Sequence, residues 1–179
     1  LPLRLGKGHL YEGGIRVPTI VRWNGITKPG SRSDEPVVSY DYAPTFAEIA
    51  GVAKGKTAAM DGRSILPLLK GARSLRRDNF WHYPHYSPQL GKPSAAIRSG
   101  DEKLILFFED RNVELYNLKT DIGEKQDLAA VQPARAAELR RRLEAWLDET
   151  KAQLPQPNRN YNPQRERETG PPSGPVTAK

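Results

Sequence analysis

Four strand-length segments between residues 79 and 118 constrain the fold of this chain more than any other feature. Each is rich in aromatic or branched apolar residues, and short polar turns, such as the one around Gly100, separate the later ones. Short turns of this kind join neighbouring strands in antiparallel order. The pattern therefore predicts an antiparallel four-stranded sheet with a face that another element must cover. The expected strands span residues 79–83, 95–98, 103–109 and 113–118.

An amphipathic helix over residues 133–151 is expected to supply that cover. Pro133 suits the first turn of a helix, where its missing N–H is not needed. The apolar residues that follow recur at helical spacing and form one stripe. We expect this stripe, including its tryptophan, to be buried against the sheet. Its members are Ala136, Leu139, Leu143, Trp146 and Leu147.

The first 72 residues predict a different arrangement. Residues 17–23 are mostly apolar and indicate a strand at the edge of a larger sheet, exposed on one side. Asp41 and Ser64 are candidate N-caps of two helices, the second of which spans residues 65–70. The first of these helices stops before a glycine and is expected to carry an apolar face. That face consists of Tyr42, Phe46 and Ile49.

Changes in composition divide the chain into three regions. The helical first region, residues 1–72, gives way near Ala72 to the strand-rich second region, residues 73–155. Residues 156–179 are rich in Pro, Asn, Arg and Gln and contain few apolar residues. A segment that cannot bury apolar surface predicts an extended or disordered tail.

Charge, cysteine content and hydropathy limit the classes of function. The chain has no cysteine, which excludes disulfide scaffolds and thiolate zinc sites. Its net charge of +7 is spread along the chain, whereas nucleic-acid binders usually gather their charge on one face. The excess in residues 1–72 suits a small anionic ligand at least as well, and we expect no nucleic acid as partner. No apolar run approaches the roughly 20 residues of a membrane-spanning helix. Because the chain begins with Leu1 rather than Met, a fragment or a processed chain is expected.

The glycine-rich segment over residues 6–18 carries the densest chemical signal. It reads GKGHLYEGGIRVP, and its glycines allow backbone to approach a ligand closely. It resembles the second signature of type I sulfatases, the arylsulfatase-like branch of the alkaline-phosphatase superfamily, which includes N-acetylgalactosamine-6-sulfatase-like and arylsulfatase A-like enzymes. The resemblance covers residues 4–158 and continues in shorter matches. These are DYAPT (41–45), DGRS (61–64), WHYPHY (81–86), AIR (96–98), KLI (103–105) and ELYNL (114–118).

The resemblance implies an α/β, alkaline-phosphatase-like sulfatase of which this chain is the C-terminal portion. Residues 1–72 would end the catalytic domain, and residues 73–155 would form an α+β subdomain. Such enzymes hydrolyse sulfate esters of small molecules or glycans with a formylglycine and a calcium ion. In the family the formylglycine and the calcium ligands lie upstream of the part that this chain matches, so we expect no metal ligand here. The partner of this chain would be the missing N-terminal part of the same catalytic domain, and we expect the chain alone to have no sulfatase activity. Export to a periplasm or the outside is typical of the family, although these residues do not show it.

Lys7 is the candidate catalytic residue. The resemblance assigns it to a sulfate oxygen and to the charge on the departing alkoxide. A free lysine is cationic at neutral pH, and Gly6 and Gly8 leave room for a tetrahedral anion beside it. A compact charge placed where negative charge develops lowers the barrier.

The remaining candidates have less defined roles. Glu12 and Arg16 are expected to structure the loop through charge-assisted hydrogen bonds. His9 is expected either to contact substrate or to make a structural hydrogen bond. His82 and His85 lie among aromatic residues that suit a sugar or aryl group, or they belong to a packed strand. Two histidines are too few for a zinc site, which needs three or four ligands.

The sequence allows three further interpretations, the first of which we do not favour. Ser94 begins a Ser-x-Ala-x-Arg match to a formylglycine site, but it opens a predicted strand after the lysine motif, so we do not expect it to be the nucleophile. The chain could belong to a phosphatase or phosphodiesterase of the same superfamily, although the Lys7 motif favours sulfate. It could also be a non-enzymatic anion- or glycan-binding module.

Overall fold

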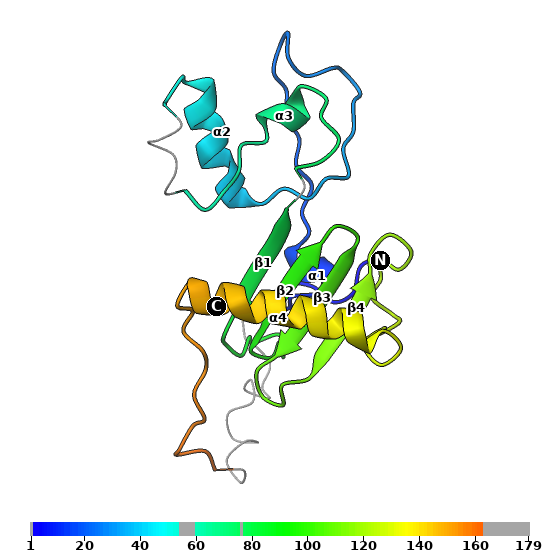
Figure 1. The fold of residues 1–179 in the computed structure, drawn as a ribbon, viewed down its shortest axis with the longest axis vertical. Helices are drawn as coiled ribbons and strands as arrows, with labels where there is room; N and C mark the ends of the chain where they lie inside the picture. The colour runs from blue at the N-terminus through cyan, green and yellow to red at the C-terminus, as the bar shows by residue number, and fades with distance from the viewer. Residues whose placement is uncertain (1, 54–59, 76, 163–179) are drawn as a thin grey trace, which may run out of the picture.

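The computed structural model describes residues 2–53, 60–75 and 77–162 (Figure 1). A four-stranded sheet with helices on its two faces forms one part of the molecule, and a smaller lobe carries two further helices. The helices are α1 (Glu12–Ile15), α2 (Tyr42–Ile49), α3 (Leu66–Leu69) and α4 (Pro133–Glu149), and the strands are β1 (Asp78–Tyr83), β2 (Ser94–Ser99), β3 (Glu102–Phe107) and β4 (Val113–Asn117). Within the described ranges, no helix has both the length and the apolar character needed to cross a membrane.

The sheet is the predicted antiparallel meander, in the order β1-β2-β3-β4. Ile97 on β2 lies opposite Phe80 on β1 and Leu104 on β3, which fixes the register of the three strands. β3 ends two residues earlier than expected. The chain turns there with Arg111 at φ 59°, and the Phe107 N–H donates to the Asn112 carbonyl at 2.9 Å.

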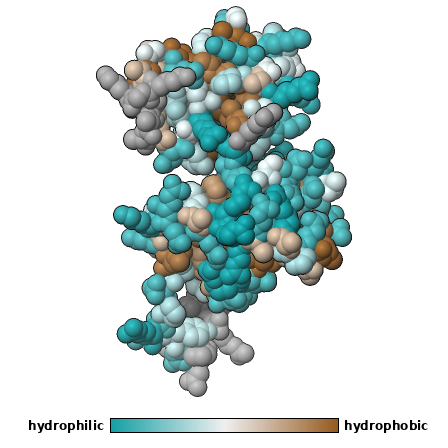
Figure 2. Space-filling view, in the orientation of Figure 1, coloured by the Kyte–Doolittle hydropathy of each residue, from teal (hydrophilic) through white to brown (hydrophobic). Residues whose placement is uncertain are grey.

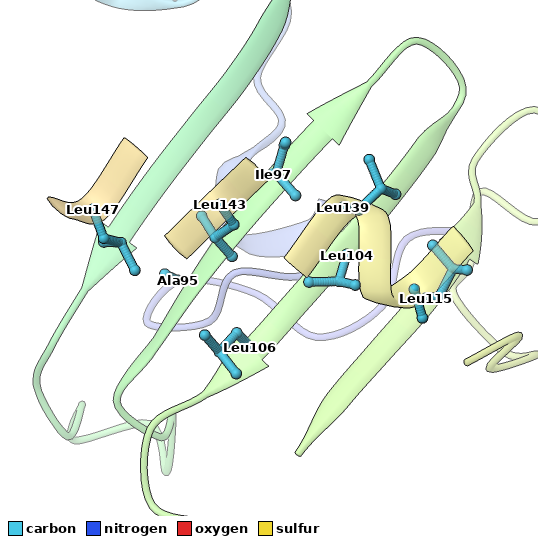
Figure 3. Packing of buried hydrophobic residues seen from close by; sticks show 9 residues of the cluster. Ala95, Ile97, Leu104, Leu106, Leu115, Leu139, Leu143 and Leu147 are labelled. Carbon is cyan, nitrogen blue, oxygen red and sulfur yellow. The ribbon is translucent and has the colours of Figure 1, made fainter. Parts of the chain in front are cut away.

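α4 covers one face of the sheet, as the sequence predicts (Figure 3). Its leucines interdigitate with the apolar side chains of β2, β3 and β4, and most of these residues are fully buried. Trp146 differs from the prediction because it is only half-buried: its ring stacks on Phe80 at 4.8 Å near the edge of the sheet. The helix residues in this core are Ala136, Leu139, Leu143 and Leu147.

The opposite face of the sheet is covered by residues 2–15, which the sequence did not predict. Leu10 and Tyr11 pack against the sheet together with the partly buried Ile15. With both faces covered, the inner strands show runs of buried residues instead of alternation. The sheet residues in this second core are Ala96, Ile105 and Tyr116, followed by Leu118.

The strand expected over residues 17–23 is wrong for the described chain. The segment is extended but pairs with no described strand, and Ile20 is 93% exposed. A strand requires a neighbour that satisfies its N–H and C=O groups. Ile20 is exposed, as we predicted for this segment, but no larger sheet is present among the described residues.

α2 forms where the sequence predicts it, but its exposed and buried faces are not the expected ones. Phe46 is 67% exposed, whereas Pro44 and Thr45 are buried. Asp41 does not cap the helix through its side chain; its carboxylate instead accepts the N–H groups of Val38 and Arg63. Of the tail predicted over residues 156–179, the part from residue 163 onward lies outside the described residues.

α3 is shorter than expected and is tied to α2. The Ser64 hydroxyl accepts the Leu66 N–H at 3.2 Å, which agrees with its predicted place at the start of this helix. The hydroxyl of Thr45 on α2 accepts the Ile65 N–H at 2.9 Å. The small lobe is therefore held together by polar contacts around Asp41 and Thr45, and it has little apolar core of its own.

Candidate functional site

Lys7 lies at the turn of a short loop that leads into α1. The turn closes with the His9 N–H donating to the Gly6 carbonyl at 3.3 Å. Gly8 has φ +92°, a conformation that residues with a side chain rarely adopt. The Lys7 side chain is exposed, and its ammonium is not paired with any residue that the structure describes.

The loop between β1 and β2 packs directly on this turn. A Cβ atom at Gly8 would stand 2.5 Å from the Ser87 hydroxyl, and one at Gly91 would stand 1.9 Å from the Gly8 carbonyl oxygen. The Nε2 atom of His9 lies 2.9 Å from the Gln89 carbonyl oxygen. These contacts fix the turn from one side, and they place His9 in a hydrogen bond with the backbone.

Glu12, the first residue of α1, is buried and surrounded by cations. Its Oε1 atom accepts the Lys103 ammonium at 3.0 Å. Its Oε2 atom lies 3.6 Å from Arg16 and 3.8 Å from Arg98. Arg16, the partner that the sequence suggested, is exposed and more distant, so Lys103 is the principal partner of Glu12.

Lys103 and Glu124 are site residues that sequence reasoning missed. The Lys103 ammonium is fully buried and also donates to Glu124 Oε1 at 2.8 Å. Burial raises the pKa of the Glu124 carboxyl, against the opposing effect of Lys103. The sequence did carry a signal that Lys103 is buried: it lies two residues before the apolar Ile105 in the same strand, and alternate residues of a strand share a face.

Arg4 ties the other end of the loop to the sheet. Its guanidinium lies 4.0 Å from the centre of the Tyr11 ring and donates to the Tyr116 hydroxyl at 2.7 Å. Both tyrosine hydroxyls donate to Glu114 Oε2, at 2.6 and 2.8 Å. Burial, reinforced by the Glu114 carboxylate, raises the pKa of both tyrosines, which are therefore neutral donors at neutral pH.

The two histidines of the aromatic segment do not join Lys7. His82 follows Phe80 by two residues and shares its α4 face, where its ring meets Phe108 edge-on at 5.6 Å. Its Nε2 atom is buried without a hydrogen-bond partner among the described residues, and burial, with the charge of His85, lowers its pKa. His85 is exposed and contacts the Tyr83 ring.

Neither a nucleophile nor a metal site is evident among the other described side chains of this region. Ser94 is buried at the start of β2, and its hydroxyl donates to the Lys92 carbonyl at 3.0 Å. Among the described residues, no group of three or more His, Asp or Glu side chains is arranged to hold a metal ion.

Comparison with known proteins identifies the family of the chain. Residues 5–153 match the family model described as N-sulphoglucosamine sulphohydrolase, C-terminal. A sulfatase of Formosa agariphila is 40% identical over 162 residues, which cover 82% of this chain and 29% of that protein. Human arylsulfatase A is 37% identical over 105 residues, which cover 59% of this chain and 20% of that enzyme.

Solved structures give the same result for the fold. A crystal structure of Ps i-CgsB in complex with k-i-k-neocarrahexaose superposes with a TM-score of 0.67 at 30% identity, over 81% of this chain and 32% of that chain. A structure of BT4656 in complex with its substrate D-glucosamine-2-N,6-O-disulfate gives a TM-score of 0.52 at 30% identity, over 62% of this chain and 24% of that one.

These matches confirm the predicted fold class, an alkaline-phosphatase-like sulfatase fold. The chain spans less than a third of the length of each of these relatives. The part that it matches is the C-terminal part. On this evidence from sequence and structure, the chain belongs to the sulfatases.

Proposed function

We propose that the full-length protein hydrolyses sulfate esters and that this chain contributes Lys7 to the sulfate site. One observation carries the proposal: an exposed ammonium, which pairs with no residue in the described ranges, lies on a loop that is fixed on several sides. The loop is anchored before Lys7 by Arg4, after it by Glu12, and at its turn by Gln89. A loop fixed in this way around an exposed cation is suited to binding an anion.

The chemistry of sulfate ester hydrolysis explains why such a cation is useful. Negative charge grows on the departing oxygen as the S–O bond breaks, so a cation beside that oxygen stabilises the transition state more than the bound ester. A positioned charge avoids the reorganisation that water would require. Lys7 would therefore act on the rate of the chemical step more than on substrate affinity.

The nucleophile and the calcium ion are assigned, in this proposal, to the part of the protein outside this chain. Calcium requires six to eight oxygen ligands. Glu12 and Glu124, the buried carboxylates behind the Lys7 loop, are both bound by Lys103 and do not fit that role. We therefore derive no step through calcium or formylglycine here, and we expect the chain alone to lack sulfatase activity.

An apolar surface on the small lobe supports the assignment of a covering partner. Figure 2 shows apolar residues gathered on the part of the molecule that carries α2 and α3, whereas the outer face of α4 is hydrophilic. Side chains exposed in this way suit an interface. We infer that the N-terminal part of the same protein covers them. They include Val17, Ile20, Val21, Phe46 and Ile49.

The substrate that we propose is a sulfated glycan. Of the structural relatives, Ps i-CgsB was solved in complex with k-i-k-neocarrahexaose and BT4656 with its substrate D-glucosamine-2-N,6-O-disulfate. His85 is exposed at the end of the segment that leads to the Ser87 turn, beside the Lys7 loop, and is the better placed of the two aromatic-segment histidines to reach a sugar. A sugar-binding role has less support for His82, because His82 lies on the face of the sheet that α4 covers and the Lys7 loop lies on the other face. His9 is assigned to holding the loop.

The proposal is tested by measuring sulfate release from the full-length protein. Sulfated oligosaccharides and an aryl sulfate are compared with the matching aryl phosphate, and the inorganic product is separated by ion chromatography. We expect sulfate release from at least one of the sulfated glycans and far slower phosphate release. Faster phosphate release would favour the phosphatase alternative. Glycan binding without release of either anion would favour a binding module.

A further inference from the structure

The Lys7 loop rests on a charged group that is buried against the sheet, on a face that also carries Arg98 and Glu114. Lys103 is fully buried, and the residues that share its face include Ile105 and Ala96. Removing a charge from water is unfavourable until its partners compensate, and a well-packed apolar side chain is often at least as stabilising. Stability alone therefore does not account for a lysine at this position.

The partners of Lys103 come from two segments that are distant in sequence. One is Glu12 at the start of α1, and the other is Glu124 in the loop after β4. The second carboxylate oxygen of Glu124 accepts the backbone N–H of Glu12 at 2.7 Å. Glu124 thus holds the start of α1 twice, directly through the backbone and indirectly through the shared ammonium.

Glu124 also holds the segment that precedes the loop. Its backbone carbonyl accepts Arg4 at 2.8 Å. Its φ of 51° is in the left-handed region, which is unfavourable for a residue with a side chain. In this conformation one residue engages Arg4 with its carbonyl and Glu12 with its side chain, so both flanks of the Lys7 loop converge on it.

The position of Lys7 is therefore set by groups that never reach the substrate. Lys7 lies three residues after Arg4 and five before Glu12, in a loop too short to absorb a shift of either flank. A displacement of about 1 Å in a catalytic group can lower the rate about 100-fold.

We propose that Lys103 and Glu124 are positioning residues of the sulfate site, forming a buried carboxylate–ammonium–carboxylate clamp that holds the Lys7 loop against the sheet. The inference rests on the proposed function, because the position of Lys7 matters to catalysis only if Lys7 acts on sulfate. Arg16 and Arg98 lie farther from Glu12 than Lys103 does, and they play a secondary part.

The test is a double-mutant cycle in the full-length protein between Lys103→Met and Lys7→Ala. A clamp that acts through Lys7 predicts that Lys103→Met lowers kcat by about 10- to 100-fold with KM little changed. In the Lys7→Ala background the same change is expected to lower kcat less than about 3-fold, because the group that it positions is already gone. Lys119→Met is the matched control, because Lys119 is exposed and its ion pair with Asp101, at 4.0 Å, lies on the surface. The kcat of this variant should equal that of the wild type.

Folding is followed separately so that a structural role is distinguished from a positioning role. All rates are measured well below the melting temperature of each variant, and hydrogen exchange is followed over residues 4–16, where faster exchange is expected in Lys103→Met. If Lys103→Met does not fold, Glu124→Gln takes its place in the cycle, since it keeps the shape of the side chain and removes its charge.

Two results overturn the inference in different ways. Losses that multiply in the double variant, or a folded Lys103→Met or Glu124→Gln with normal kcat, would show that the clamp does not act through Lys7. If the wild type releases no sulfate, or if Lys7→Ala keeps normal kcat, the proposed function itself fails, and the clamp proposal fails with it.

Discussion

At the scale of single residues, backbone conformation or a buried charge restricts which amino acid a position can hold. Gly8 combines φ +92° with the Ser87 hydroxyl directly beside its Cα, so it is constrained by both conformation and space. Asp41 is fully buried and receives Arg77 together with two backbone N–H groups. Changes at these two residues separate loop geometry from lobe stability.

Gly8→Ala is expected to lower both stability and activity. The left-handed conformation costs an alanine about 1–2 kcal/mol, and its Cβ would displace Ser87 and with it the turn that carries Lys7. Gly100→Ala is the matched control, because Gly100 also has a positive φ, 61°, but has open space around its Cα. Thermal melts should show a larger loss for Gly8→Ala, which adds the clash with Ser87 to the conformational cost that both variants share, and only Gly8→Ala should lose kcat. Equal kcat values would contradict the close packing of the two loops.

The buried carboxylate of Asp41 should make the folding stability of the full-length protein fall at acid pH. Burial alone would raise the pKa of its carboxyl, but hydrogen bonds from Arg77, Val38 and Arg63 outweigh that effect and hold the pKa below its usual value. A carboxyl with a lowered folded-state pKa stabilises the fold above its unfolded pKa of about 4, and the contribution is lost as the pH falls through the folded value.

Asp41→Asn should therefore cost about 3–5 kcal/mol at pH 7, because it leaves Arg77 buried without its charge partner. The difference from wild type should shrink as the pH falls below about 4. Urea unfolding at several pH values measures both effects, with the exposed Asp101→Asn as control. A difference that stays constant down to low pH would contradict the role assigned to the carboxylate.

At the scale of elements, α4 is the principal support of the sheet. Leu143 is fully buried among the strands, whereas Trp146 is half-buried at the edge of this core and stacks on Phe80. Leu143→Ala is expected to cost about 3–4 kcal/mol, within the range for buried leucines. Trp146→Ala should cost about 2 kcal/mol, because much of the ring already contacts water. Chemical denaturation gives both values, and a larger loss for Trp146→Ala would contradict this ranking.

The elements also show which parts of the fold could be predicted from sequence. β1–β4 and α4 form from local signals, namely apolar periodicity and turn residues, so their bounds were close to correct. The strand over residues 17–23 depends on a neighbour that is not among the described residues, and apolar character alone could not reveal that. Lys103 was missed because a charge within an apolar strand reads as exposed until its distant partners Glu12 and Glu124 are known.

At the scale of the whole molecule, the chain divides into a well-packed sheet and a lobe with an apolar exterior. The sheet has a core on each face, whereas the lobe exposes Ile20 and Phe46. Lys7 has no nucleophile within hydrogen-bond reach among the described residues, so the chain by itself should not turn over an aryl sulfate with calcium. Turnover by the chain alone that disappears in Ser94→Ala would contradict this and would make the buried serine the nucleophile.

The central claim is that Lys7 acts on the sulfate group, and the kcat of Lys7→Ala in the full-length protein tests it most directly. The account predicts a fall in kcat of roughly 10²–10³-fold, comparable to the loss of one oxyanion donor, with an unchanged melting temperature because the exposed ammonium contributes little to folding. Lys7→Arg should restore only part of the rate, since a planar guanidinium does not replace a compact charge between two glycines. A folded Lys7→Ala enzyme with normal kcat would contradict the account.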